Sequence, residues 1–467
     1  EVLLEFEGKK LTLPALPSSY IILEENTVNI RSCRKYFQHL IQSVPSVSQD
    51  HAPLPVAHLQ ANVTQPFGAS NVVEACVSNL TTIVEGEDVK TVHDLTLSYP
   101  PDTGHRHWPG DTIGILSYNT DADVEFLLAR LNLLSKGDVV CKVGIDKKTT
   151  KKAAKVPAFV PAVVSYRRLI KECLDLHAVP KKLLICSLTP FTTDDDDRRF
   201  LEILCSKEGN AAYEQTVQKG KGIISLLQLV PSCRPTVALL IEHLPRLMPR
   251  PYSIANAYRE GASPTTVRFI FSHNAENPGI TTSHLRALGK GATVHFYFRQ
   301  SSAFVYEQRD LRRNIIMVGT GTGMSPYLSF LQLRADALAQ GETLGRAELI
   351  VGFRYRDRGY LCKAEVEEYL ETGALDACYE AFSRDPNARH KYVQSQMKEN
   401  GKKIVENIHN PHATLYVCGD SKVLLPQITE TVIDILAEAP GAEDRDAIKT
   451  LIGRLKKEGK YREDVWL

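Results

Sequence analysis

From residue 313 onward, short apolar runs alternate with helical patterns, and this alternation constrains the fold more than any other feature. "NIIMV" at 314–318 leads through a glycine-rich turn into "SPYLSFLQLRADALAQ". The same order recurs at "AELIVGF" and "CKAEVEEYLETG", and again at "ATLYVCGD" and "SKVLLPQITETVIDILAEA". Strands that alternate with helices are typical of a parallel sheet covered by helices. We therefore predict an α/β domain with a parallel sheet over 311–467.

The residues before this domain show two other patterns. Strand-like runs with turn signals between them occur at 72–80, 91–99, 266–274 and 292–300. Between these runs, residues 122–247 carry apolar residues at helical spacing, as in "DVEFLLARLNLL" and "RRFLEILCSKEG". We predict that 51–121 and 248–310 form one antiparallel β-barrel and that a helical domain, 122–247, interrupts it. Residues 1–50 are predicted to be a linker.

Charge and cysteine content exclude several classes of protein. The 467 residues include 56 Lys and Arg against 55 Asp and Glu, without the basic excess that marks nucleic-acid binding. No apolar run reaches the roughly 18 residues that a membrane span needs. The 10 cysteines include no Cys-x-x-Cys pair, which indicates reduced thiols rather than a zinc site or a disulfide framework. We expect a cytoplasmic protein without a metal site.

The glycine-rich turn "VGTGTGMSP", at 318–326, is the first candidate binding site. Glycines let a pyrophosphate approach the backbone, and the N-terminus of the following helix offers N–H donors. The turn departs from the ordinary dinucleotide fingerprint because Met324 stands at its sixth position. A plain tight turn is the alternative. The predicted phosphate-binding residues are Gly319, Gly321, Thr322, Gly323 and, after the next strand, Arg354.

A second candidate site follows the third strand, in "AFSRDPNARHKYVQ" at 381–394. Guanidinium, ammonium and hydroxyl groups suit a phosphate, and a tyrosine ring suits an adenine face. An exposed charged loop is the alternative, but nucleotides bind at the carboxyl edge of parallel sheets, where this segment lies. We predict a site for a 2′-phosphate at Ser383, Arg384, Lys391, Tyr392 and Gln394.

Two strings in the barrel region carry related chemistry. In "RLMPRPYSIAN", Arg250 can neutralise a phosphate, Tyr252 can stack on a ring and Ser253 offers a hydroxyl. In "NPGITTSHL", residues 279–282 offer backbone N–H groups and hydroxyls, which together can hold a second pyrophosphate.

In this order, the strings resemble the ferredoxin-NADP reductase superfamily: Pro-Gly-Asp, Arg-x-Tyr-Ser, Gly-Ile-x-Thr, Gly-x-Gly-Thr-Gly, Cys-Gly-Asp and an aromatic end. In that superfamily a β-barrel holds FAD and an adjoining α/β domain holds NADPH. The helical insertion and the terminal "DVWL" are similar to the diflavin reductases, whose helical domain lies between the barrel and an N-terminal FMN domain. No flavodoxin-like segment precedes residue 50, so FMN is expected only on a domain missing from this chain.

The resemblance implies site residues and roles. It places FAD at Arg250, Pro251, Tyr252, Ser253, Phe271, Gly279, Ile280, Thr281, Thr282 and Trp466, and it adds Cys418 and Asp420 to the NADPH residues above. The catalytic residues are then Ser253, Cys418, Asp464 and Trp466. Ser253 hydrogen-bonds near flavin N5, Cys418 lies beside the nicotinamide, and Asp464 orients the cysteine.

Trp466, one of 2 tryptophans in the chain, stands one place from its end. The resemblance implies that its ring covers the exposed face of the flavin and moves aside for the nicotinamide. The alternative is a ring that plugs the core.

Stretches such as "PALPSSY" and "LCSKEGNAAY" look most like the branch of the diflavin reductases whose partner is methionine synthase. That resemblance implies a route for electrons from NADPH through FAD to the FMN domain and on to the cob(II)alamin of methionine synthase. A microsomal cytochrome or sulfite type of diflavin reductase is the first alternative. A reductase-shaped binding module without turnover is the second.

Overall fold

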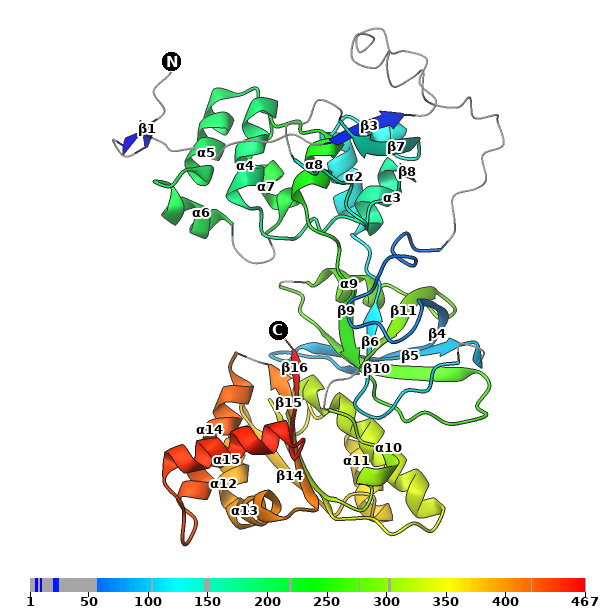
Figure 1. Cartoon of the computed structure of the whole chain (residues 1–467), viewed down its shortest axis with the longest axis vertical. Helices are drawn as coiled ribbons and strands as arrows, with labels where there is room; N and C mark the ends of the chain where they lie inside the picture. Colours follow the sequence, from blue (N-terminus) through cyan, green and yellow to red (C-terminus); the bar gives the residue numbers. More distant parts are fainter. Residues whose placement is uncertain are drawn as a thin grey trace. The chain divides into compact units, whose positions relative to one another are not determined.

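The computed structural model describes the strands at 5–6, 9–10 and 20–24 and the ranges 57–101, 104–146, 152–217, 221–276, 278–300, 304–420 and 422–466. The chain forms two compact units (Figure 1). The first comprises 1–63, 116–249 and 279–284, and the second comprises 64–115, 250–278 and 285–467. The domain boundaries predicted from the sequence stay a prediction.

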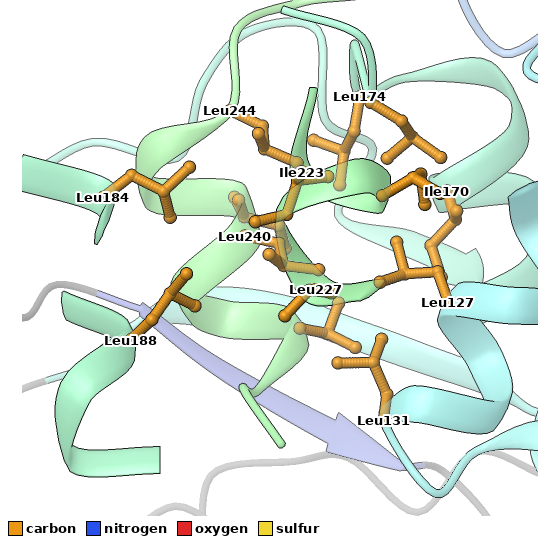
Figure 2. Close-up of a cluster of buried hydrophobic side chains, with 14 of the residues drawn as sticks. Leu127, Leu131, Ile170, Leu174, Leu184, Leu188, Ile223, Leu227, Leu240 and Leu244 are labelled. Atoms are coloured by element: carbon orange, nitrogen blue, oxygen red, sulfur yellow. The ribbon is translucent and has the colours of Figure 1, made fainter. Parts of the chain in front are cut away.

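Helices dominate the first unit, as the periodicity between 122 and 247 predicts. They are α2 (Asp121–Arg130), α3 (Tyr166–Glu172), α4 (Lys182–Leu188), α5 (Asp195–Cys205), α6 (Asn210–Thr216), α7 (Ile223–Leu229) and α8 (Val237–His243), with the 3-10 turns η2 (Leu134–Lys136) and η3 (Thr189–Phe191). Leu127, Leu227 and Leu240 come from different helices and are fully buried. Figure 2 shows these side chains in one core. Burial of each leucine contributes about 1.5–3 kcal/mol.

A small antiparallel sheet also belongs to the first unit. Its strand order is β3 (Tyr20–Glu24), β7 (Val140–Ile145) and β8 (Val163–Ser165). The strand β3 lies within the stretch that the sequence predicts as a linker, and its backbone pairs with β7 from Tyr20↔Ile145 to Glu24↔Cys141. The short strands β1 (Glu5–Phe6) and β2 (Lys9–Lys10) pair with each other.

The described strands of the barrel region form a six-stranded antiparallel sheet in the order β10-β5-β4-β11-β6-β9. They are β4 (Val73–Val84), β5 (Thr91–Tyr99), β6 (Thr112–Ile115), β9 (Arg250–Ser253), β10 (Thr265–His273) and β11 (Thr293–Arg299). Just after β9, Ile254 pairs with Phe269 of β10, and Ala255 N donates to Arg268 O at 2.7 Å. This bridge joins the two outer strands, so the sheet closes as the sequence predicts. The helix α9 (Ile280–Arg286) lies between β10 and β11 in the chain.

The Pro-Gly-Asp turn before β6 has the tight geometry that its sequence predicts. Gly110 has a φ of +97°, and a Cβ there would lie 1.8 Å from the carbonyl oxygen of Phe304, so a side chain has no room. The Asp111 carboxylate accepts a hydrogen bond from Trp108 N at 2.7 Å. Burial raises the pKa of Asp111 to about 6. The ring of Trp108 packs against the guanidinium of Arg106, 4.6 Å from its centroid.

The remainder of the second unit is the predicted α/β domain. Its strands are all parallel, in the order β14-β13-β12-β15-β16. They are β12 (Asn314–Thr320), β13 (Ala347–Phe353), β14 (Ala377–Phe382), β15 (Ala413–Asp420) and β16 (Tyr461–Trp466). Figure 1 shows α10 (Ser325–Ala339) and α11 (Lys363–Thr372) on one face of this sheet. The other face is covered by α12 (Val393–Glu399), α13 (Gly401–His409), α14 (Leu424–Ala437) and α15 (Arg445–Lys457).

The alternation of strands and helices from residue 313 onward is therefore confirmed. The last helix, α15, buries Ile448, Ile452 and Leu455, which recur at the spacing of one helical face. A 3-10 turn, η4 (Gln308–Asp310), precedes β12. Throughout the described part of the chain, no helix has both the length and the apolar character of a membrane span.

Candidate functional site

The glycine-rich turn stands at the carboxyl end of β12. It forms the 3-10 turn η5 (Gly321–Met324), which runs directly into α10. A Cβ on Gly319 would lie 2.9 Å from the carbonyl oxygen of Gly323 and 3.1 Å from the ring of Tyr327. Gly321 has a φ of +53° and open space where a Cβ would be. Glycine therefore lets the turn fold back against its helix and leaves backbone exposed at its tip.

A cavity of about 610 Å³ opens beside this turn within the second unit. This volume lies in the range of ligand pockets, about 300–1,000 Å³. The predicted coenzyme residues that line it are Gly321, Thr322, Arg354, Ser383, Lys391, Tyr392, Gln394 and Asp420. The fold thus gathers side chains from the ends of separate parallel strands. Exposed ammonium and guanidinium groups, hydroxyls and a glycine turn at one edge fit a dinucleotide that carries an extra phosphate.

The ends of β13 and β14 stay paired beyond the strands and fix the arginines of this edge. Ser383 N donates to Phe353 O at 2.9 Å, and Arg384 N donates to Arg354 O at 2.9 Å. Arg354 and Arg384 are therefore neighbours. Both also contact Asp88, which lies in the turn between β4 and β5.

Two other predicted residues of the cavity, Asp420 and Gln394, make hydrogen bonds to neighbouring segments. Asp420 Oδ1 accepts from Lys422 N at 3.2 Å and from Val423 N at 2.8 Å, so this carboxylate caps the turn before α14. The Gln394 amide donates to Gln427 at 2.9 Å. Tyr392 is 61% exposed, which leaves its ring free to accept a flat partner.

A polar cluster lies where β9 of the barrel meets the edge of the parallel sheet. Asp464 Oδ2 accepts a hydrogen bond from Ser253 Oγ at 2.9 Å and from Cys418 Sγ at 3.5 Å. Cys418 stands opposite Gly319 in the neighbouring strand, which places the cluster beside the glycine turn. Burial, followed by the charge of Asp464, raises the pKa of the Cys418 thiol well above its usual value. The thiol therefore stays protonated and acts as a donor.

The residues predicted to bind FAD lie in both units. Arg250 and Pro251 are exposed on β9, while the ring of Tyr252 lies 4.9 Å from that of Phe269. Burial raises the pKa of Tyr252 above its usual value. Phe271 is buried in the barrel core. An exposed guanidinium followed by a ring and a hydroxyl on one short strand suits the phosphate and ring of a flavin nucleotide.

The second predicted pyrophosphate segment begins α9 and belongs to the first unit. Thr282 Oγ1 donates to Gly279 O at 3.1 Å, and the hydroxyls of Thr281 and Ser117 lie 2.5 Å apart. Ile280 is buried. The prediction that this segment joins Arg250–Ser253 in one FAD site stays a prediction.

Trp466 ends β16, where its backbone lies opposite Asp420 in β15. Its side chain lies outside the described residues. The predicted cover of the flavin by this ring stays a prediction.

The sequence analysis missed several side chains around the cavity. Lys90 lines it, and Asp88 and Tyr355 meet beside it. A further group joins the barrel to the α/β domain, because Arg268 binds both Asp94 and Glu365. These partners are 174 and 97 residues from Arg268 in the chain. No local pattern could have indicated pairings over such separations.

Comparison with known proteins identifies the family. A model described as "FAD binding domain" matches residues 65–276, and one described as "Oxidoreductase NAD-binding domain" matches residues 317–428. Methionine synthase reductase of Mus musculus is 32% identical, over 91% of this chain and 68% of the relative. The chain belongs to the methionine synthase reductase family. Methionine synthase reductases of Bos taurus and Homo sapiens are 31% and 30% identical, each over 95% of this chain and over 71% and 70% of the relative.

Membership of the methionine synthase reductase family confirms the resemblance to the diflavin reductases. The chain is an NADPH-dependent flavoprotein oxidoreductase whose cofactors are FAD and NADPH. The two matched models cover most of the closed antiparallel sheet and the glycine turn with its cavity. The predicted fold, a barrel interrupted by helices and followed by a parallel α/β domain, is also confirmed.

Proposed function

We propose that this member of the methionine synthase reductase family passes electrons from NADPH, through its FAD and an FMN-binding domain, to the cob(II)alamin of methionine synthase. When bound, NADPH supplies a hydride and FAD accepts it. The observation that carries the proposal is the shared contact of Ser253 and Cys418 with Asp464, beside the glycine turn. The relatives of Mus musculus and Homo sapiens are methionine synthase reductases, which supports methionine synthase as the final acceptor.

Each residue of the cluster has a distinct part. Asp464 holds a negative charge where a nicotinamide ring that loses a hydride becomes positive, and such preorganised charge lowers the barrier. Cys418, held protonated by its raised pKa, presents an uncharged thiol to a flat ring. Ser253 donates a hydrogen bond to Asp464 at 2.9 Å, and its hydroxyl can donate that hydrogen bond to a flavin nitrogen instead.

A second group of residues binds the phosphates of the coenzyme, which lie away from its reacting ring. Ser383, Arg384 and Lys391 bind the 2′-phosphate, and Gly321 and Thr322 offer their N–H groups to the pyrophosphate. In the same proposal the ring of Trp466 shields the flavin until nicotinamide replaces it. These interactions orient the coenzyme so that its nicotinamide ring reaches the cluster of Ser253, Cys418 and Asp464.

Anaerobic bleaching of the bound flavin tests the first half of this proposal. The purified yellow protein is mixed with NADPH or with NADH in a stopped-flow instrument, and the flavin absorbance is followed. We expect fast bleaching by NADPH and slow bleaching by NADH. A binding module without turnover would stay yellow with both coenzymes.

The acceptor is tested separately. The NADPH-reduced protein is given ferricyanide, cytochrome c or inactive methionine synthase, with and without an FMN-binding domain added in trans. We expect ferricyanide to be reduced in either case, and methionine synthase to be reactivated with the added domain, slowly because the domain is not tethered. Reduction of cytochrome c without any reactivation would favour another type of diflavin reductase.

A further inference from the structure

The turn between β4 and β5 carries an aspartate that contacts two arginines predicted to bind the coenzyme. Tyr355 donates its hydroxyl to Asp88 Oδ2 at 2.7 Å, and Arg384 forms an ion pair with Asp88 Oδ1. Arg354 Nη1 donates to the backbone oxygen of Asp88 at 2.7 Å and lies 3.7 Å from its carboxylate. One acidic residue of the barrel thus binds side chains from the ends of both β13 and β14.

These contacts occupy groups that the proposed function gives to the coenzyme. Arg384 is the predicted partner of the 2′-phosphate, and its neighbour Arg354 lines the cavity. A carboxylate and a phosphate offer similar oxygen acceptors to a guanidinium. We propose that Asp88 is an internal anion that holds Arg384 and Arg354 in the absence of coenzyme, and that the 2′-phosphate of NADPH displaces it. The inference rests on the proposed coenzyme site.

Charge explains why displacement is expected rather than joint binding. A 2′-phosphate carries close to two negative charges, which matches two guanidinium groups better than one carboxylate does. A carboxylate left on the same arginines would also repel that phosphate. Lys391 and Lys90, which line the cavity, add positive charge on the side of the phosphate.

The strength of the contact allows exchange. The side chains of Asp88 and Arg384 are 38% and 45% exposed, so water screens their attraction. Exposed ion pairs of this kind shift an equilibrium by about 1.4- to 5-fold. Asp88 is therefore weak enough to yield to NADPH, and its displacement lowers the affinity for the 2′-phosphate by the same small factor. It sets how strongly the site binds the 2′-phosphate of the coenzyme.

The backbone of Asp88 indicates the variant that tests this inference. Its φ of +61° lies in the left-handed region, which asparagine tolerates as well as aspartate does. Asp88→Asn removes the charge and keeps the turn. Glu87→Gln is the matched control, because it removes the same charge from the exposed neighbouring position of that turn.

Calorimetric titration of the FAD-loaded protein with 2′,5′-ADP and with 5′-ADP supplies the readout. We expect Asp88→Asn to tighten binding of 2′,5′-ADP by about two- to five-fold and to leave 5′-ADP unchanged. Tyr355→Phe, which removes one hydrogen bond from the Asp88 carboxylate, should give a smaller gain in the same direction. In Asp88→Asn combined with Arg384→Ala, the gain should vanish.

Other outcomes separate this inference from the coenzyme site on which it rests. Weaker binding of 2′,5′-ADP by Asp88→Asn would mean that Asp88 orients Arg384 for the phosphate, and an equal gain in Glu87→Gln would mean a general effect of charge. Either result overturns the inference and leaves the site intact. If Arg384→Ala alone keeps the full preference for 2′,5′-ADP over 5′-ADP, the proposed 2′-phosphate site is itself wrong.

Discussion

Cys418 and Asp464 face each other across the parallel strands β15 and β16, with Sγ 3.5 Å from Oδ2. The register of these strands sets them directly opposite, and Ser253 of the barrel completes the contact from another sheet. A thiol with a raised pKa beside a carboxylate is a stable donor and acceptor pair. Because the Cys418 thiol keeps its proton, Asp464 keeps its negative charge in this position.

Neutralising that charge should slow reduction of the flavin. A hydrogen bond to a charged group contributes about 1.5–3 kcal/mol, so Asp464→Asn should lower the rate of bleaching by NADPH by about 10- to 150-fold. Glu463→Gln is the control, because Glu463 is the neighbouring acid of β16 and pairs with Lys456 at 2.7 Å instead. Equal rates in both variants, at equal flavin content, would remove Asp464 from the chemistry.

The barrel and the α/β domain share an ion-pair network centred on Arg268. Its guanidinium lies 2.6 Å from Asp94 Oδ2 and 2.7 Å from Glu365 Oε1, and these charges raise its pKa against the opposing effect of burial. Glu365→Gln should lower the free energy of unfolding by about 1–3 kcal/mol, because a largely buried cation loses a charged partner. Chemical denaturation measures this difference.

An exposed pair of the same unit supplies the comparison for Arg268. Arg259 is 60% exposed and binds Asp336 at 2.9 Å. Asp336→Asn should therefore cost less than about 1 kcal/mol. A loss as large as that of Glu365→Gln would show that burial does not strengthen the Arg268 network.

His107 should make the second unit sensitive to acid. It is 1% exposed, and burial lowers its pKa to about 4. Between pH 6.5 and 4 the unfolded chain binds the proton and the folded chain does not, so this residue lowers stability as the pH falls. The loss between pH 7 and pH 5 is about 2 kcal/mol by linkage.

Replacing the ring tests this assignment. His107→Phe keeps the stacking on Phe298 and removes the titrating group, so the fall in unfolding free energy from pH 7 to pH 5 should shrink. Burial raises the pKa of Asp111 to about 6, so Asp111 adds stability as the pH falls. It is present in both proteins, and its contribution therefore cancels when their pH dependences are compared. An unchanged slope in His107→Phe would show that the buried imidazole is not the source.

The start of α5 offers a local test of stability in the first unit. Asp194 Oδ1 accepts hydrogen bonds from Asp196 N and Asp197 N, both at 3.0 Å. Asp194→Ala should cost about 0.5–2 kcal/mol, and Asp194→Asn, which keeps the cap, should cost much less. Thermal unfolding of the two variants gives the comparison. Equal losses would indicate that the charge matters and the hydrogen bonds do not.

Local patterns in the sequence determined most of the described elements and several of the polar residues that line the cavity. Helical spacing, strand alternation and the glycine turn depend on neighbours within a few residues, so α5, β12 and η5 could be predicted directly. Parallel strands end at a common edge, which is why the two candidate sites that contain Arg354 and Ser383 could both be expected at that edge, where the structure brings these residues to one cavity.

Tertiary structure alone decided which distant side chains meet. Ser253 and Asp464 are 211 residues apart, and Asp88 and Arg384 are 296 apart. The strand β3 likewise needed β7 as its partner before its residues could be distinguished from a linker. Such contacts depend on how the barrel closes and packs on the parallel sheet, because residues with no local periodicity in common come together only when the chain is folded. The sequence by itself therefore determined several residues that line the cavity beside the glycine turn, and the packing of the barrel against the α/β domain decided which charges surround that cavity.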